Sequence, residues 1–212
     1  MDNNMEKAVV ITGGSGFIGS NVCKLFVESG FNVINIDRKK REIPGVTQYP
    51  FEIDNKQVKG IIELIKPHAV IHIAADNSVP KSVLDPMPTY TDNVYQTISL
   101  LNTCVGAKVP NFIYASSSSV YGTNKDIPFK ETHSLNECNS PYAVSKLCKE
   151  MYAKLYFKLY NVNSIGLRFF TVYGPRGRPD MAPYKFLKAI YTDLSLIHIS
   201  EPTRRTPISY AV

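Results

Sequence analysis

Short apolar runs alternate with amphipathic stretches along most of this 212-residue chain. The apolar runs are almost continuously hydrophobic, which is typical of strands buried on both faces of a parallel sheet. We expect strands at 7–12, 32–37, 47–53, 69–74, 111–116 and 162–168. Helical periodicity predicts helices at 17–29, 56–66, 89–108, 140–160 and 183–192. This alternation predicts the α/β class, with a doubly wound parallel sheet covered by helices on both faces.

Three segments between these elements follow neither period, and we predict them to be loops. Residues 38–47 are basic, residues 76–88 contain three prolines, and residues 171–180 are rich in glycine, proline and arginine.

Composition narrows the class of protein. Hydrophobic residues make up 44% and charged residues 20% of the chain, as in ordinary globular proteins. There is neither an apolar run long enough to span a membrane nor a basic-then-apolar leader, so we expect a cytoplasmic protein without membrane contact. The four cysteines lack CxxC pairing and the four histidines lack metal-ligand spacing, so we expect reduced thiols and no metal site. The net charge of +6 is not gathered in one block, which favours an anionic small molecule over nucleic acid.

Residues 13–19 (GGSGFIG) form a glycine-rich turn between the first strand and the first helix. Gly13 permits a tight turn, Gly16 lets the backbone approach a pyrophosphate, and Gly19 lets the helix pack closely on the sheet. The helix N-terminus then presents N–H groups and a partial positive charge to the phosphates. The turn therefore predicts a dinucleotide site, and a purely structural glycine turn is the alternative.

Asp37 ends the second strand, at the spacing where an acidic residue accepts hydrogen bonds from an adenosine ribose. A carboxylate there disfavours a 2′-phosphate, so NAD is the expected cofactor. The basic residues 38–41 leave NADP as the alternative, although a solvated loop also explains their charges.

Tyr142 and Lys146 have the i, i+4 spacing that places both side chains on one helix face. A free tyrosine has a pKa of about 10, too high for a base at neutral pH. A neighbouring ammonium and the positive nicotinamide ring favour the phenolate and lower that pKa. The serine run 116–119 leaves the fifth strand at its C-terminal end, where ligands of open α/β sheets bind, so a hydroxyl there can contact a reacting oxygen. An ordinary exposed pair and a polar turn are the alternatives.

Together these motifs resemble the extended short-chain dehydrogenase/reductase family of NAD-dependent nucleotide-sugar epimerases and dehydratases. The resemblance covers about Lys7 to Thr192 and rests on TGGSGFIGS, Asp37, HIAA at 72–75, Asn93, SSSSVYG, SPYAVSK and LRFFTVYGPRGRPDMA. It implies a Rossmann fold, NAD as cofactor, a UDP-sugar substrate and a further C-terminal substrate domain. It also implies a homodimer when the chain is full length, through the helices at 89–108 and 140–160.

The resemblance also assigns roles to residues. Tyr142 is implied to be the base, Lys146 its partner and Ser117 the catalytic hydroxyl. The implied cofactor contacts are Gly13, Gly16, Phe17, Ile18, Gly19, Asp37, Arg38, Glu52, Ile53, Ile73, Ala74, Ala75, Asn93, Ser116, Tyr142, Lys146 and Phe169. The implied substrate contacts are Ser117, Ser118, Ser119, Lys81, Thr171 and Arg178.

The same resemblance indicates the reaction. Ser118 and Ser119 stand where family dehydratases carry an Asp-Glu pair, so the second acid–base group that elimination needs is missing. Epimerisation needs only reversible hydride transfer. The stretch 168–182, with Thr171 and Arg178, resembles UDP-glucuronate 4-epimerases most closely. We therefore expect conversion of UDP-glucuronate to UDP-galacturonate through transient oxidation to a 4-keto sugar.

Two alternatives to this function remain open. Pro80 stands where many glucuronate epimerases have arginine, so a UDP-glucose or UDP-N-acetylglucosamine 4-epimerase is the first alternative. Lys81 could substitute for that arginine. A non-catalytic NAD-binding protein, or an inactive fragment, is the alternative from a different class.

The final residues differ in character from the rest. Residues 194–212 continue no helical or strand period, and LSLIHISEPTR resembles the translation of a sequencing adapter. We expect two parts: an NAD-binding domain with the start of a substrate-binding region at 1–193, and a non-native tail at 194–212. On this interpretation the gene continued beyond Asp193 and the chain is a fragment; a genuine, unusual C-terminus is the alternative.

Overall fold

The computed structural model describes residues 7–135, 137–179 and 181–192. The chain divides into two compact units, Met1–Phe169 and Phe170–Val212, and each is described by itself. The tail predicted at 194–212 lies outside the described residues.

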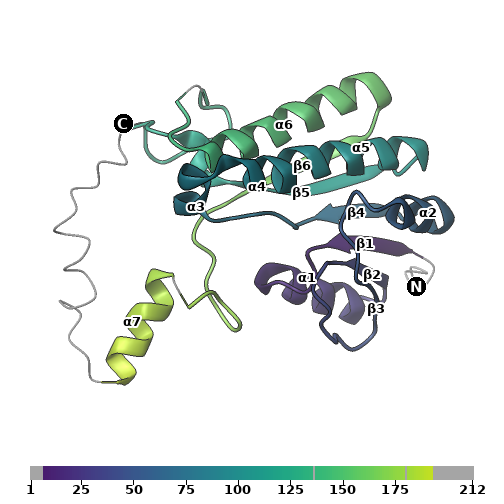
Figure 1. The fold of residues 1–212 in the computed structure, drawn as a ribbon, viewed down its shortest axis with the longest axis horizontal. Coiled ribbons are helices and arrows are strands. Elements are labelled where there is room, and N and C mark those ends of the chain that lie inside the picture. Colours follow the sequence, from purple (N-terminus) through teal and green to yellow (C-terminus); the bar gives the residue numbers. More distant parts are fainter. Residues whose placement is uncertain (1–6, 136, 180, 193–212) are drawn as a thin grey trace. The chain divides into compact units, whose positions relative to one another are not determined.

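The first unit is built on a six-stranded, all-parallel sheet in the order β3-β2-β1-β4-β5-β6 (Figure 1). This confirms the predicted doubly wound α/β class. The strands are β1 Ala8–Thr12, β2 Asn32–Ile36, β3 Val46–Tyr49, β4 Ala69–His72, β5 Asn111–Ser117 and β6 Asn163–Phe169. The strand order reverses between β1 and β4, so the carboxyl ends of these two strands flank the point where open α/β sheets bind ligands.

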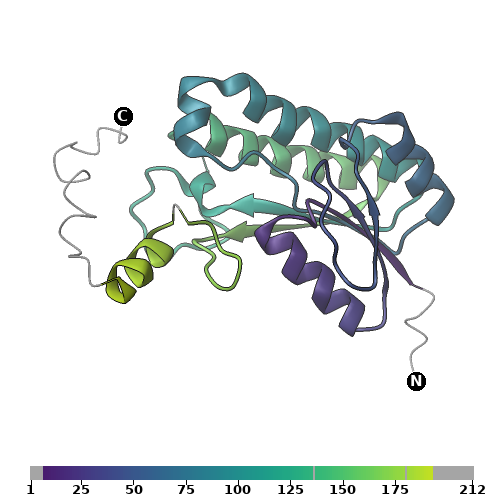
Figure 2. The same cartoon turned by 60° about the horizontal axis from the view of Figure 1, so that its bottom comes forward.

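Helices cover both faces of this sheet. Because side chains alternate along each strand, Val10 faces a core shared with α2, α5 and α6, whereas Val9 and Ile11 face a second core shared with α1. Figure 2 shows α1 on the opposite side of the sheet from the two long helices. The helices are α1 Phe17–Glu28, α2 Lys56–Ile65, α3 Val79–Leu84, α4 Pro86–Tyr90, α5 Gln96–Gly106 and α6 Pro141–Tyr160, with a π-helix at Thr91–Tyr95 and a 3₁₀ helix at Ser118–Tyr121.

The predicted loop at 76–88 is wrong, because this segment contains α3 and the start of α4. Ser78 and Asp85 cap these helices, each accepting a backbone N–H with its side chain. Pro80 and Pro86 lie in the first turns, where a missing N–H costs no helical hydrogen bond. The prolines therefore begin helices here rather than prevent them.

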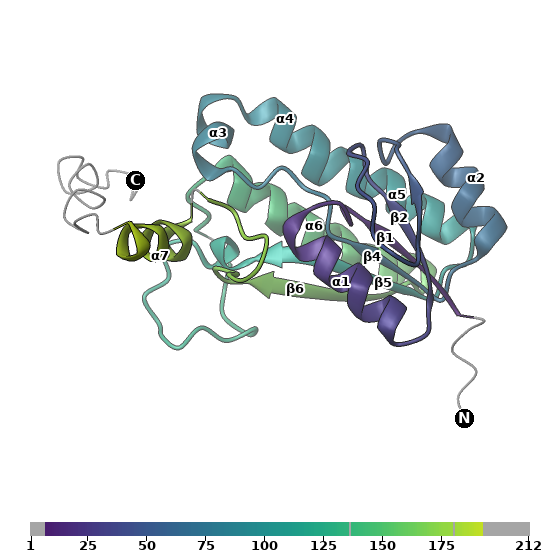
Figure 3. The same cartoon turned by 90° about the horizontal axis from the view of Figure 1, so that it is seen from below.

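The helix predicted at 89–108 begins earlier, at Pro86, and contains the π turn at 91–95 before it continues as α5. In Figure 3, α3 and α4 lie at one end of the layer that contains α5 and α6. Extra residues in a π turn rotate the side chains that follow, and such turns are frequent at functional sites. Here the turn carries Asn93, whose contacts are described below.

In the second unit, the predicted helix at 183–192 is confirmed as α7, Ala182–Tyr191. Nowhere in the described parts of the chain is a helix both long and apolar enough to cross a bilayer.

Candidate active site

The glycine turn between β1 and α1 depends on the absence of side chains. Gly13 has φ +76, and a Cβ there would lie 2.6 Å from the backbone nitrogen of Ala74, which follows β4. A Cβ on Gly19 would overlap the carbonyl oxygen of Gly13. The turn therefore brings the start of α1 against the carboxyl ends of β1 and β4, in the cradle that a pyrophosphate needs.

Asp37 is tied to this turn. Its carboxylate accepts the N–H of Ser15 at 3.0 Å and the N–H of Lys39 at 2.8 Å. An ionised carboxylate has about four acceptor positions, so capacity remains for ribose hydroxyls. At the start of α1 the N-cap is Gly16, which has no side chain to accept an N–H of the first turn. The chemistry of both groups fits the dinucleotide predicted from the sequence.

The two predicted cofactor contacts Arg38 and Glu52 form an ion pair with each other. The Arg38 guanidinium lies 3.6 Å from Glu52 and 3.2 Å from Asp92. Asp92 above all raises the pKa of Arg38, so this cation stays charged and carboxylates balance it. This arrangement disfavours an extra phosphate at Arg38, in agreement with the choice of NAD over NADP.

Tyr142 and Lys146 lie together near the start of α6. Lys146 is 2% exposed, and its ammonium donates to the carbonyl oxygen of Ala115 at 3.1 Å and lies 5.6 Å from the centre of the Tyr142 ring. Burial lowers the pKa of Lys146 to about 8, and the nearby carboxylate of Asp76 opposes this shift. At pH 7 the ammonium is therefore still the main form, beside the phenol.

The predicted serines end β5 close to the helix that carries this pair. The Ser117 hydroxyl accepts the N–H of Ser119 at 3.1 Å and lies 3.1 Å from the Ser119 hydroxyl. The Ser116 hydroxyl instead donates to the carboxylate of Glu150 on α6. Ser117 thus caps the following 3₁₀ helix, whereas the side chain of Ser116 is bonded to Glu150 of α6.

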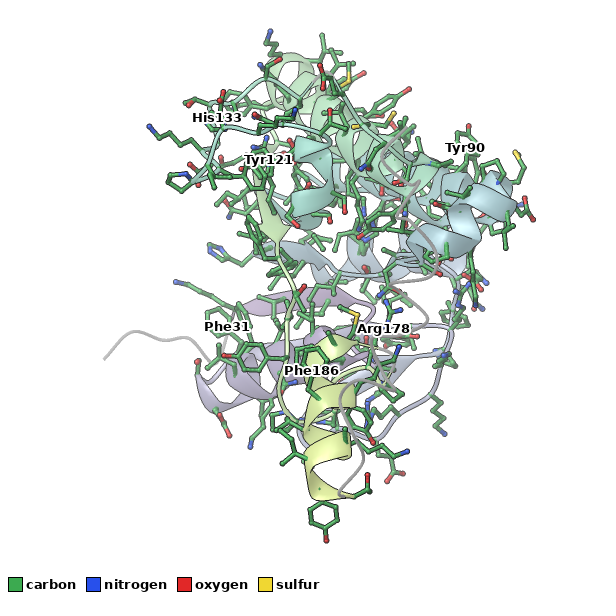
Figure 4. The ribbon with its side chains drawn as sticks, turned by 90° about the vertical axis from the view of Figure 1, so that its left-hand side faces the viewer. Phe31, Tyr90, Tyr121, His133, Arg178 and Phe186 are labelled. Atoms are coloured by element: carbon green, nitrogen blue, oxygen red, sulfur yellow. The ribbon has the colours of Figure 1, made fainter. Side chains whose placement is uncertain are left out.

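Arg168, which was not among the predicted site residues, joins β6 to α6. It donates two hydrogen bonds to Glu150, at 2.9 and 2.8 Å, and one to the Tyr121 hydroxyl at 3.1 Å. Bidentate pairs of this kind fix geometry as well as charge. The Tyr121 ring also stacks on Phe129 at 4.5 Å and meets His133 edge-on; Figure 4 labels Tyr121 and His133. The loop after Ser117 is thereby fastened to the sheet.

Asn93 is fully buried on the π turn and points its amide toward α6. Its Nδ2 donates to the carbonyl oxygen of Asp76 at 2.8 Å and to the hydroxyl of Ser145 at 2.9 Å. Its Oδ1 has no hydrogen-bond partner among the described residues. A buried acceptor without a partner costs free energy unless a ligand or water satisfies it, so the residue fits the cofactor contact predicted for it.

His72, at the end of β4, is a buried neutral imidazole. Its Nδ1 accepts from the Thr12 hydroxyl at 2.7 Å. Its Nε2 donates to the Thr97 hydroxyl at 2.9 Å, because that hydroxyl donates its own proton to the carbonyl oxygen of Asn93. Burial holds the pKa of His72 well below its usual value. The residue therefore joins β1, β4 and α5 through its two hydrogen bonds.

Lys149 was not predicted to be buried, yet it is 0% exposed and its Nζ has no hydrogen-bond partner among the described residues. It follows Lys146 by three positions and Tyr142 by seven, on the same face of α6. Burial, and then the charge of Lys146, hold the pKa of Lys149 well below its usual value. The i, i+4, i+7 spacing from Tyr142 was the available sequence signal, although the many other charged residues of this helix made Lys149 look like a solvated lysine.

The remaining predicted residues fall into two groups. The first group belongs to the first unit. Near the carboxyl ends of its strands, Phe17 and Ile18 begin α1, Ile73, Ala74 and Ala75 follow β4, Phe169 ends β6, and Ser118 begins the 3₁₀ helix. In the same unit, Lys81 is exposed on α3 and Ile53 is buried in the core. Thr171 and Arg178 belong to the second unit. Among the described residues no cluster of His, Cys, Asp or Glu has the makeup of a metal site.

Comparisons with known proteins agree with this geometry. Residues 9–203 match the model of the NAD dependent epimerase/dehydratase family. The chain is 36% identical over 203 residues to Protein CapI of Staphylococcus aureus, and 33% identical over 206 residues to a probable UDP-glucuronate 4-epimerase of Rhizobium meliloti. These matches cover 89% and 86% of the chain but only 61% and 58% of the relatives, so the chain spans about six tenths of their length.

Solved structures of nucleotide-sugar 4-epimerases also superpose on this chain. The UDP-glucuronic acid 4-epimerase from Bacillus cereus, in complex with UDP-glucuronic acid and NAD, superposes with a TM-score of 0.80 at 32% identity, over 89% of this chain and 64% of that one. The UDP-N-acetylglucosamine 4-epimerase from Methanobrevibacter ruminantium superposes with a TM-score of 0.81 at 31% identity, over 89% and 64%.

Proposed function

The chain belongs to the NAD dependent epimerase/dehydratase family, and we propose that it inverts C4 of a UDP-sugar with NAD as the hydride carrier. The observation that carries this proposal is the buried ammonium of Lys146 beside the ring of Tyr142, at the carboxyl edge of a doubly wound sheet. We assign residues 1–193 to the cofactor domain and the start of the substrate region.

The residues that would hold NAD are spread along this edge. The glycine turn and the start of α1 bind the pyrophosphate, Asp37 binds the adenosine ribose, and Asn93 and Lys146 bind the nicotinamide riboside. NAD supplies a reversible acceptor for the hydride of the sugar C4.

The proton is handled by Tyr142. Its phenolate oxygen takes the proton of the sugar 4-hydroxyl as C4 loses hydride, which leaves a 4-keto sugar. Lys146 stabilises the phenolate by its positive charge. The Ser117 hydroxyl turns from Ser119 and donates to the 4-oxygen, which orients the sugar. After the keto sugar turns over and hydride returns to its other face, Tyr142 returns the proton to the same oxygen.

For the substrate we propose UDP-glucuronate, with UDP-galacturonate as product. Ser118 and Ser119 provide hydroxyls and no carboxyl group, which suits a sugar that already carries a carboxylate and leaves no second acid–base group for elimination. Thr171 and Arg178, and the relatives whose names specify glucuronate, support the same choice.

A direct comparison of sugars tests this choice. The chain, and a chimera that continues after Asp193 with a relative's C-terminal region, are incubated with NAD and with UDP-glucuronate, UDP-glucose or UDP-N-acetylglucosamine. We expect turnover of UDP-glucuronate at least tenfold faster than the others. Absence of UDP-galacturonate, with turnover of a neutral sugar, contradicts the substrate proposal and leaves the C4 reaction standing.

The second candidate, a 4-epimerase of UDP-glucose or UDP-N-acetylglucosamine, is favoured by one observation. Pro80 occupies the first turn of α3, so the arginine expected of many glucuronate epimerases is missing there. Neighbours of similar TM-score are named for both neutral sugars, including the UDP-glucose 4-epimerase of Thermotoga maritima at 0.82.

We also propose that the full-length protein is a homodimer through α5 and α6. Val144, Met151 and Leu155 on α6 are 47%, 63% and 44% exposed and follow helical spacing, which supports an apolar contact stripe. Sedimentation of the chimera tests this, and we expect Met151→Lys to shift a dimer toward monomer.

A further inference from the structure

The main chain of Tyr142 is held by side chains at both of its peptide groups. Its N–H donates to the hydroxyl of Ser82 at 3.2 Å, across 60 positions of sequence. Its carbonyl oxygen accepts from the hydroxyl of Ser145 at 2.7 Å. The Cα that carries the phenol is therefore fastened on both sides.

The first of these bonds meets a need that every helix has. The N–H groups of a first helical turn have no acceptor within the helix. In α6, Pro141 has no N–H, and the Ser140 side chain accepts from Ala143 at 3.2 Å. Ser82 supplies the acceptor for Tyr142 from outside the helix. Ser82 is 0% exposed and Tyr142 is 9% exposed, so bulk water has little access to replace it.

The orientation of the Ser82 hydroxyl is fixed. It donates its single proton to the carbonyl oxygen of Val79 at 2.7 Å, so a lone pair faces the N–H of Tyr142. α3, which carries Ser82, is thus bonded to the first turn of α6 through one side-chain oxygen.

The second bond leads back to the same part of the chain. Ser145, which donates to the Tyr142 carbonyl oxygen, accepts from Nδ2 of Asn93, and that amide also donates to the carbonyl oxygen of Asp76. Residues 76–93 therefore reach the main chain of Tyr142 twice, once through α3 and once through the π turn.

We propose that Ser82 is a positioning residue for Tyr142, and that it couples the placement of α3 to the placement of the phenol. The residue before Ser82 is Lys81, which we assign to the substrate side, so a sugar nucleotide that moves α3 also moves the base. The catalytic consequence rests on the function proposed above, whereas the mechanical link does not.

Amide hydrogen exchange of the 212-residue chain tests the mechanical link. With ¹⁵N-tyrosine labelling and assignment through Tyr142→Phe, we expect Ser82→Ala to speed exchange at the Tyr142 amide about tenfold, as for a lost hydrogen bond. Ser82→Thr, which keeps the oxygen, should restore the rate to within about twofold. The matched control is Thr103→Val, because that hydroxyl bonds the Ser99 carbonyl oxygen of its own helix. An unchanged rate in Ser82→Ala, or the same acceleration in Thr103→Val, overturns the proposal.

A further variant guards against misfolding at this buried position. Ser82→Cys fills the space of the hydroxyl with a slightly larger thiol and weakens the acceptor, so it should resemble Ser82→Ala. Wild-type exchange in Ser82→Cys would mean that filling the space is enough, and would contradict the role of the oxygen even if the threonine variant does not fold.

Steady-state kinetics tests the catalytic consequence. We expect Ser82→Ala to lower kcat about tenfold with KM within about twofold, since the base is misplaced while binding contacts persist. Ser82→Thr should recover kcat. An unchanged kcat in Ser82→Ala overturns the proposal. If neither the wild-type chain nor the wild-type chimera turns over a UDP-sugar, the proposed function fails, and the exchange experiment still decides the role of Ser82.

Discussion

The glycine turn and the start of α6 face the same edge of the sheet but are held in place by different means. The turn at 13–19 is fixed by what its residues lack, since a Cβ on Gly13 or Gly19 would meet neighbouring backbone. The start of α6 is fixed by side chains from distant segments, because Ser82 and Asn93 both contribute hydrogen bonds to it. Backbone sterics give the proposed phosphate site its shape, and hydrogen bonds give the proposed base its position.

This difference predicts how each region fails. A substitution in the turn should disturb folding and cofactor binding together, because the same backbone does both. A substitution on α6 should separate the two, since a side chain there can be lost while the backbone remains in place.

The largest separation is expected for Tyr142→Phe. Removal of the hydroxyl should lower kcat by about 10²–10⁴-fold, as for loss of a general acid–base group, while the Tm and the Kd for NAD stay close to wild type. Tyr160→Phe, an exposed tyrosine on the same helix, is the matched control. Residual activity above a tenth of wild type would remove Tyr142 from its proposed role.

Lys149→Met should change the stability of the protein without a change in the backbone of α6. The variant removes a buried amine without a hydrogen-bond partner, so we expect the free energy of unfolding at pH 7 to rise by about 1–3 kcal/mol. Lys154→Met, at an exposed position on the same helix, should change it by less than about 0.5 kcal/mol. Urea unfolding measures both, and a destabilised Lys149→Met would show that this amine has a partner after all.

The stability difference between Lys149→Met and the wild type should depend on pH. The pKa of Lys149 in the folded protein lies well below the ordinary value of 10.5, so at a pH between these two values the unfolded chain binds a proton that the folded chain does not. As the pH rises toward 10.5, the unfolded chain loses this proton and wild-type stability rises relative to the variant. The advantage of Lys149→Met should shrink by up to about 1.4 kcal/mol per pH unit. An advantage that grows with pH would contradict the assignment.

In the glycine turn, Gly19→Ala should reduce stability and cofactor binding together. Its Cβ would overlap the Gly13 carbonyl oxygen and lie 2.7 Å from the Cα of Gly14, so backbone must shift, at a cost of about 1–3 kcal/mol. Gly60→Ala on α2 meets nothing within 4 Å and should be neutral or stabilising by up to about 1 kcal/mol. Equal effects of the two variants in thermal unfolding and NAD titration would show that the turn tolerates side chains.

The smallest effect is expected at Asp37. Asp37→Asn removes the charge that opposes a 2′-phosphate and keeps a side-chain acceptor for the N–H of Ser15. The ratio of the NADP Kd to the NAD Kd should fall about tenfold, which corresponds to about 1.4 kcal/mol. Asp54→Asn, at an exposed position after β3, should leave the ratio unchanged in calorimetric titrations.

The two regions also differ in how much of their structure could be predicted from the sequence alone. The glycine turn, the acidic end of β2 and the Tyr142–Lys146 pair follow from local spacing, and the structure contains each where it was predicted. The segment 76–88 was predicted wrongly, because its prolines were interpreted as breakers although Ser78 and Asp85 cap two helices there.

The contacts that hold α6 were missed for a different reason. Ser82 meets Tyr142 across 60 positions and Arg168 meets Glu150 across 18, so no local pattern reveals either bond. Lys149 resembles a solvated lysine in the sequence, and only the packing of α6 on the sheet shows that it is buried.

The most direct test of the central claim follows deuterium at C4 of the sugar. UDP-glucuronate labelled with deuterium at C4 is incubated with NAD and the protein, as the chain itself and as the chimera, in ordinary water, and the product is examined by NMR. Because C4 hydrogen leaves as hydride and returns within the site, we predict UDP-galacturonate that keeps its deuterium at C4. Epimerised product that has exchanged deuterium for solvent hydrogen would show proton abstraction from carbon and contradict the account.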